Sequence, residues 1–194
     1  MRIEARLVMA GALIVLALAP PVSAWLTARL VTHILGQYLP LVVAGALIGS
    51  VLGGRVRAAW TAAPSFLMAL FALGFWLLPR WIDAALVDPV AATAKATTLV
   101  LLAGMPLGWG WAQAGPVLRG FVVANAASML LIMGWLQQAV PQRLCNAYLI
   151  SDQRALGLGF LILAAALVAG AFLQALLEPC HAGSAAPDRP APSP

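Results

Sequence analysis

Long apolar segments alternate with short polar stretches along the whole chain. Each apolar segment is long enough, or nearly so, for a helix that crosses a bilayer core, which takes roughly 20 residues. The pattern therefore predicts an all-α fold, a polytopic transmembrane helical bundle of six spans, or five if the first segment is a cleaved signal. The predicted spans cover residues 7–19, 30–53, 64–78, 96–111, 117–136 and 155–177.

The first apolar segment has two interpretations, because it also has the layout of a secretory signal. Basic Arg2 and Arg6 precede it, and Val-Ser-Ala at 22–24 supplies the small residues of a cleavage site. A cleavable signal peptide and an uncleaved signal anchor both fit this pattern. The predicted units are the signal peptide or anchor (1–24), the helical bundle (25–178) and a disordered C-terminal tail rich in Pro, Ala and Ser (179–194).

The composition indicates that the surface of the folded chain faces lipid. The chain is 63% hydrophobic and 9% charged, whereas a soluble domain has about a quarter charged residues. The net charge of +5 comes from basic residues scattered between apolar segments, which fits topological anchoring at lipid headgroups and not a nucleic-acid partner. Arginines in the N-terminal segment and after the second span favour a cytoplasmic N-terminus, in the inner membrane of a bacterium.

Most polar side chains then fall on the outer side of the membrane. We expect two polar loops there, residues 79–95 and residues 141–154, close to the outer start of the second span. If these loops fold over the helix ends, their side chains meet. The candidates on this outer face are His33, Gln37, Asp83, Asp88, Lys95, Arg143, Cys145, Asn146, Asp152 and Gln153.

His33 is the first candidate for a metal ligand. A neutral imidazole binds copper, zinc or haem iron, and Gln37 lies four residues on, on the same helical face. Cys145 offers a thiolate and Asp83 a carboxylate, although no sequence spacing brings these groups together. The alternative is a histidine that hydrogen-bonds a neighbouring loop. The two cysteines, Cys145 and Cys180, lie on opposite sides in this topology, so we expect no disulfide between them.

Small residues and a proline shape the spans. Gly45, Gly49 and Gly53 recur every fourth residue on one helical face, which lets two helix backbones approach closely. Packing within the chain and dimerisation both use such a face. Pro106 removes a backbone donor inside the fourth span, so we expect a kink there.

Motifs of common enzymes are missing from the sequence. It contains no phosphate-binding Walker loop, no GxSxG, no HExxH and no CxxCH. The predicted spans carry no carboxylate of the kind that proton-coupled transporters use. We therefore expect a protein that is not an enzyme.

Three short motifs follow one another in a recognisable order. They are Thr-His-Ile-Leu-Gly-Gln-Tyr-Leu-Pro at 32–40 before an Ala- and Gly-rich helix, Leu-Pro-Arg-Trp-Ile-Asp at 78–83, and Ser-Asp-Gln at 151–153 with Leu-Gly at 156–157. They resemble the His-bearing helix, the LPR stretch and the last polar element of the integral-membrane assembly factors of caa-type cytochrome c oxidases. The resemblance spans residues 31–160, and Gln37 stands where that family carries a second histidine.

The resemblance implies an accessory or assembly protein of a respiratory oxidase, with an oxidase subunit as partner and copper handled on the outer face. His33 and Cys145 are the metal ligands to test first. Two alternatives stay open: a small-solute transporter, and a purely structural subunit of a membrane complex held by the glycine face.

Overall fold

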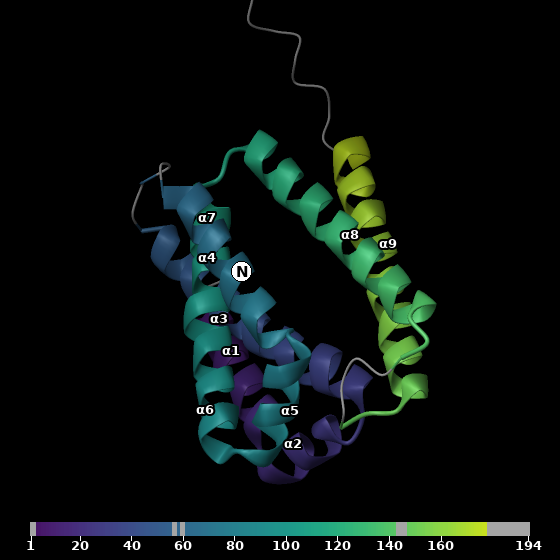
Figure 1. Ribbon diagram of the computed structural model, residues 1–194. Helices are drawn as coiled ribbons and strands as arrows, with labels where there is room; N and C mark the ends of the chain where they lie inside the picture. The colour runs from purple at the N-terminus through teal and green to yellow at the C-terminus, as the bar shows by residue number, and fades with distance from the viewer. Residues whose placement is uncertain (1–2, 56–57, 59–60, 143–146, 178–194) are drawn as a thin grey trace, which may run out of the picture.

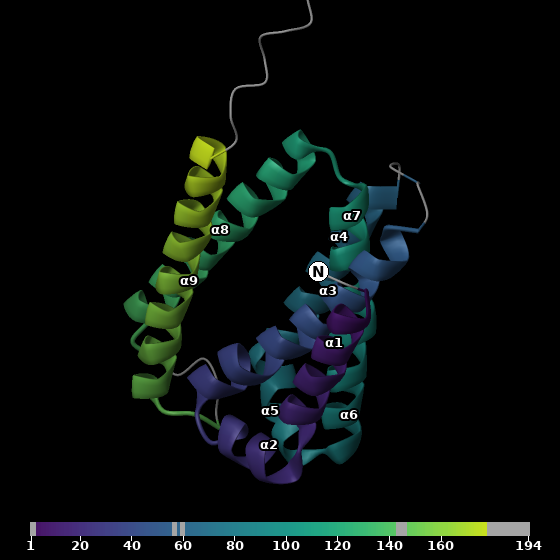
Figure 2. The same cartoon turned by 180° about the vertical axis from the view of Figure 1, so that it is seen from behind.

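The computed structural model describes residues 3–55, 58, 61–142 and 147–177, and most of these residues are helical, with no strand among them. Figure 1 shows the helices side by side, and Figure 2 shows the same arrangement from behind. In chain order they are α1 (Ile3–Leu18), α2 (Pro20–Thr27), the π-helical η1 (Thr32–Tyr38), α3 (Leu39–Gly53), α4 (Ala62–Trp76), α5 (Pro79–Val87), α6 (Pro89–Thr98), the π-helical η3 (Leu99–Gly104), α7 (Met105–Gln113), α8 (Pro116–Ala139) and α9 (Ile150–Leu177).

The helices confirm the predicted all-α multi-pass bundle. Four continuous helical stretches among the described residues are long and apolar enough to cross a membrane: Thr32–Gly53, Pro89–Gln113, Pro116–Ala139 and Ile150–Leu177. Two bent pairs, α1 with α2 and α4 with α5, also qualify if each pair counts as one span. The described residues thus hold four to six candidate spans, and the predicted six is the upper end of this range.

Proline explains both bent pairs. The chain turns by 66° between α1 and α2 and by 67° between α4 and α5. In each case the residue before the proline is extended, with ψ 127° at Ala19 and 130° at Leu78, because the proline ring disfavours helical geometry in its predecessor. Pro20 and Pro79 then open the next helix, where the missing N–H costs nothing.

The helix widens before the proline inside the fourth span. Before Pro106 the helix widens into η3, and the Met105 N–H bonds the carbonyl of Val100, five residues back. The same happens before Pro40, where the Leu39 N–H bonds the carbonyl of Ile34. A π-turn of this kind accommodates a proline within a continuous helix.

Glycines bring α3 against η3 and α7. A Cβ atom added at Gly45 or Gly49 would collide with the backbone of the facing helix, at Val100 or at Met105. Gly108 faces the backbone of Ala46 from the other side in the same way. The glycine face of α3 therefore packs within the chain, in the close approach that small residues permit.

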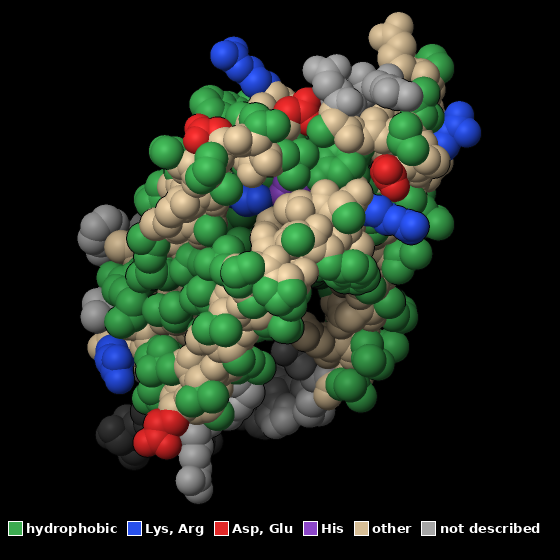
Figure 3. Space-filling model, turned by 90° about the horizontal axis from the view of Figure 1, so that it is seen from below, with side chains coloured by type: hydrophobic (Ala, Val, Ile, Leu, Met, Phe, Trp, Pro, Cys, Tyr) green, Lys and Arg blue, Asp and Glu red, His purple; other side chains and the backbone are tan. Residues whose placement is uncertain are grey.

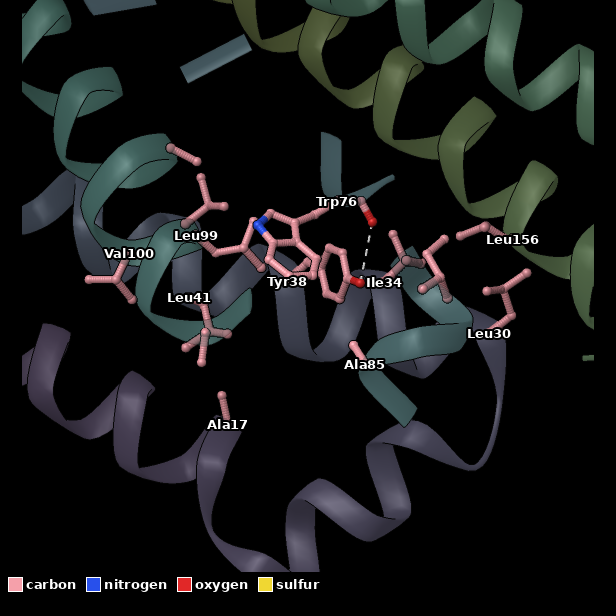
Figure 4. Packing of buried hydrophobic residues seen from close by; sticks show 14 of the residues in the cluster. Ala17, Leu30, Ile34, Tyr38, Leu41, Trp76, Ala85, Leu99, Val100 and Leu156 are labelled. Carbon is pink, nitrogen blue, oxygen red and sulfur yellow. Dashed lines mark hydrogen bonds between the residues drawn. The ribbon is translucent and has the colours of Figure 1, made fainter. Parts of the chain in front are cut away.

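A buried apolar cluster lies where η1, α3, α5 and η3 meet. Leu41 and Leu99 are fully buried in it, and Figure 4 shows Tyr38 pointing from η1 toward Trp76. The Tyr38 hydroxyl donates to the Trp76 carbonyl at 3.4 Å. The Trp76 indole N–H donates to Thr98 Oγ1 at 2.6 Å, so the end of α4 is tied to both η1 and α6.

Helices α8 and α9 form a hairpin that leans away from the other helices (Figures 1 and 2). The two helices pack closely where Gly134 faces the Gly157 carbonyl and Gly157 faces the Gly134 carbonyl. Leu156 and Phe160 belong to the buried cluster, and Leu35 packs beneath Gly159. The half of α9 beyond Ala164 contains no buried residue, so the first half of α9 attaches this hairpin to the bundle.

The first expected outer loop is largely helical, which corrects the sequence interpretation, whereas only the end of the second, from Ile150, is helical. Residues 79–95 form α5 and most of α6, so Lys95 lies inside a candidate span and not in a loop. Asp152, Gln153 and Arg154 belong to the first turns of α9. The polar residues in both stretches lower the local hydropathy, although their helices continue from, or into, a span.

Candidate functional site

His33 lies at the centre of a buried polar network. The side chain comes from η1 and is completely buried. Its Nδ1 atom lies 2.9 Å from the Tyr148 hydroxyl, and its Nε2 atom lies 2.9 Å from the Lys95 ammonium nitrogen. The network therefore joins η1 to α6 and to the segment that leads into α9.

The directions of these hydrogen bonds assign the histidine tautomer. The Tyr148 hydroxyl donates its proton to the Thr27 carbonyl at 2.9 Å, so it accepts a hydrogen bond from His33 Nδ1–H. A lysine ammonium has no acceptor, and Nε2 therefore accepts from Lys95. His33 is neutral with its proton on Nδ1, an assignment that follows from its partners.

Gln37 extends the network to the N-terminal helices. Its Oε1 accepts from Lys95 Nζ at 2.9 Å. Its Nε2 donates to the Ala17 carbonyl at 3.1 Å and to Ser23 Oγ at 3.2 Å. One amide thus connects α6 with α1 and α2, and the lysine fixes which end of the amide is oxygen.

Lys95 is buried, 3% exposed, and the described residues that it contacts are uncharged. Besides His33 and Gln37 it faces the ring of Tyr38, with Nζ 5.1 Å from the ring centroid. Among the described residues it forms no ion pair with a carboxylate. An ionisable group inside a membrane span is costly and marks a functional site by default.

The structure brings some predicted site residues together and leaves others apart. His33 and Gln37 share the face that their spacing predicts, and both bind Lys95. Asp88 is the N-cap of α6, accepting from the Val90 amide at 2.9 Å. Gln153 donates to the Gln137 carbonyl at 3.4 Å and so joins α9 to α8.

The remaining candidates lie outside this network. Asp83 is half-buried on α5, and Asp152 is half-buried in the first turn of α9, where the helix dipole favours a negative charge. Arg143, Cys145 and Asn146 lie outside the described residues. So do Cys180 and the predicted tail.

Sequence reasoning misplaced one member of the network and did not identify another as a partner of His33. We placed Lys95 in a solvated loop, although it lies between alanines and threonines that continue directly into an apolar run. That continuity was the available signal. Tyr148 lies in the polar stretch 141–154, but only the fold brings it to a histidine 115 residues away.

The network constrains metal binding. A histidine binds a metal through a free nitrogen lone pair, and Nε2 of His33 already accepts from Lys95. The described residues contain no cluster of three or more His, Cys, Asp or Glu side chains that could hold a metal ion. The pairing of His33 with Cys145 as copper ligands stays a prediction, and it requires His33 to release one of its present partners.

A cavity of about 540 Å³ lies beside Lys95. Figure 3 looks at the end of the molecule where α2 and α5 lie, and shows a histidine and a basic side chain next to each other within a largely apolar surface. Polar groups from α2, η1 and α6 line the cavity together with apolar side chains from α1 and η3. The polar lining residues are Ser23, Thr27, Gln37, Thr93, Lys95 and Thr97.

Comparison with known proteins identifies no family for this chain. No protein-family model, curated protein or solved structure matches it. The arguments about function therefore rest on the geometry above and on the sequence resemblance of residues 31–160.

Proposed function

We propose that the protein is a non-enzymatic accessory protein of the bacterial inner membrane, which docks onto a respiratory oxidase during assembly. The observation that carries the docking role is a polar side chain on the lipid-facing surface of α8. The oxidase as partner rests on the sequence resemblance. Both parts are tested below.

Asn125 lies about halfway along α8 and is exposed. Ser128 is exposed three residues further on, and the same face carries Phe121 and Ile132, which are 67% and 58% exposed. The Asn125 amide has no hydrogen-bond partner among the residues that the structure describes. This face of α8 looks away from α9, whose contacts with α8 include Gly134.

An unpartnered amide in hydrocarbon is unfavourable, because no water is present to bond it. Leaving such a group unsatisfied costs several kcal/mol. A transmembrane helix of a partner would satisfy the amide, and a hydrogen bond between membrane helices contributes roughly 0.6–2 kcal/mol. The α8 face therefore fits a partner helix better than it fits lipid alone.

The attachment of the hairpin suits a docking role. Its base is held by the Tyr148–His33 hydrogen bond and by Leu156 and Phe160 in the core. Beyond Ala164, α9 is largely exposed. A partner helix can therefore reach α8 without disturbing the buried cluster.

The test is complementation of a deletion strain. Cells without the gene should lose most of their assembled oxidase, measured as oxidase activity and as the haem a absorbance of membranes. The wild-type gene and a Met133→Leu control, an apolar exchange on a neighbouring face of α8, should restore it. Asn125→Leu should restore clearly less at equal protein abundance. Unchanged oxidase levels in the deletion strain would exclude the proposed partner.

The same strains test the copper form of the proposal. If the protein handles copper through His33, deletion lowers the copper content of the purified oxidase, and added copper restores it. If the role is docking alone, the oxidase that does assemble contains its full copper. His33→Gln separates the two roles, since a docking protein needs His33 only for stability.

A further inference from the structure

The cavity beside Lys95 combines a buried cation with hydrogen-bond donors that none of the described residues uses. A lysine ammonium has three N–H donors, and two of them are directed to His33 Nε2 and Gln37 Oε1. The described residues offer no oxygen or nitrogen acceptor to the third. Lys95 also lines the cavity.

Ser23 supplies a second donor at the same place. Its hydroxyl oxygen accepts from Gln37 Nε2, while its proton has no acceptor in the described part of the chain. Because Gln37 bonds Lys95 through one end of its amide and Ser23 through the other, it holds the two donors on one wall of the cavity. Two donors that line the same cavity, one of them cationic, match an oxyanion.

The rest of the cavity suits an alkyl chain. Ile14 and Leu18 of α1 and Val100 and Leu101 of η3 line it. Leu18 and Leu101 are 42% and 49% exposed, so the apolar part of the cavity continues to the lipid-facing surface. A volume of about 540 Å³ falls within the range of small-molecule sites, roughly 300–1,000 Å³.

We propose that this cavity binds an amphiphile with an oxyanionic head, a carboxylate or a phosphate ester, which enters from the bilayer. Lys95 and Ser23 donate hydrogen bonds to the oxyanion, and the alkyl chain lies between α1 and η3. The oxyanion also supplies the negative charge that Lys95 lacks within the described chain. This inference does not rest on the accessory role, because it concerns a different part of the molecule.

The test measures binding to the full-length protein in a neutral detergent, with ligands that separate head from tail. Dodecyl phosphate and laurate carry both parts, dodecanol carries the tail alone, and inorganic phosphate carries the head alone. Native mass spectrometry counts bound ligand, and tryptophan fluorescence reports the shift in Tm. We expect dodecyl phosphate and laurate to bind roughly tenfold to a hundredfold more tightly than dodecanol, as a hydrogen bond to a buried charge implies.

Three variants assign the site. Lys95→Gln should reduce dodecyl phosphate binding to the level of dodecanol. Ala92→Phe fills the cavity from the α6 wall, where Ala92 lines it, and should weaken both ligands while leaving every bond of Lys95 in place. Arg119→Gln, at a cation that bonds the Trp111 carbonyl far from the cavity, should change neither.

Several results would overturn the proposal. One is equal binding of dodecyl phosphate and dodecanol by the wild type. Another is full dodecyl phosphate binding by Ala92→Phe, which decides the matter if Lys95→Gln fails to fold. Equal stabilisation by inorganic phosphate and by dodecyl phosphate would mean that the ligand is a soluble anion and not a membrane amphiphile. That result would also refute the proposal.

Discussion

Replacing Tyr148 by Phe removes one hydroxyl group that serves two hydrogen-bond partners. The hydroxyl accepts from His33 Nδ1–H and donates to the Thr27 carbonyl, both at 2.9 Å, and Tyr148 is 6% exposed. Water therefore has little access to replace either bond. The phenylalanine ring fills the same space, so the change isolates the hydrogen bonds.

The expected cost follows from those two bonds. Each contributes about 0.5–1.5 kcal/mol net, so Tyr148→Phe should lower the free energy of unfolding by roughly 1–3 kcal/mol. The loss should also loosen the α8–α9 hairpin, because this hydroxyl joins the segment before α9 to both η1 and the end of α2. The bundle beyond the hairpin should keep its helix content.

The assay is equilibrium unfolding by SDS in mixed micelles, followed by tryptophan fluorescence and far-ultraviolet circular dichroism. A double-mutant cycle with His33→Gln measures the coupling, which should be about 0.5 kcal/mol or more for residues in one network. The reasoning fails if Tyr148→Phe shifts the unfolding free energy by less than the error of the method, or if the two substitutions are additive.

Two further predictions concern helix contacts. Gly49→Ala should destabilise the protein by roughly 1–3 kcal/mol, because its Cβ would collide with the Met105 carbonyl. The control Gly170→Ala, with open space around its Cβ, should be neutral or slightly stabilising. Equal effects at the two glycines would contradict the tight α3–α7 contact. Asp88→Ala removes the N-cap of α6 and should cost about 1 kcal/mol, seen in SDS unfolding and as faster hydrogen exchange of the Val90 amide; unchanged exchange would mean that the cap does not hold the helix end.

Hydropathy and proline placement predicted most of the helices of the fold. The apolar segments became helices, and the proline at 20 ended the first one as expected, because a residue before proline avoids helical geometry. The prediction of a loop at 79–95 was wrong for a physical reason. Thr93, Lys95 and Thr97 lower the hydropathy of α6, yet these threonine hydroxyls bond their own helix backbone and the lysine is satisfied by tertiary partners.

The sequence predicted less of the site than of the fold. The i, i+4 spacing placed His33 and Gln37 on one face, which is local information. Their shared partner Lys95 lies about 60 residues away, and Tyr148 lies further still. Such contacts depend on how the spans pack, and one chain read alone carries no signal for that packing. The π-helical widening before Pro106 was not predicted from the sequence, which indicated only a kink there.

The docking role of α8 is the central claim, and photocrosslinking in native membranes tests it most directly. A photoreactive amino acid is placed at Phe121 or Ile132 on the exposed face of α8 and, as a control, at Ala127, which is 4% exposed. We predict that the two exposed positions crosslink to a respiratory oxidase subunit, while position 127 crosslinks only within the chain. Crosslinks from positions 121 and 132 to lipid alone, or to a second copy of this chain, would contradict it.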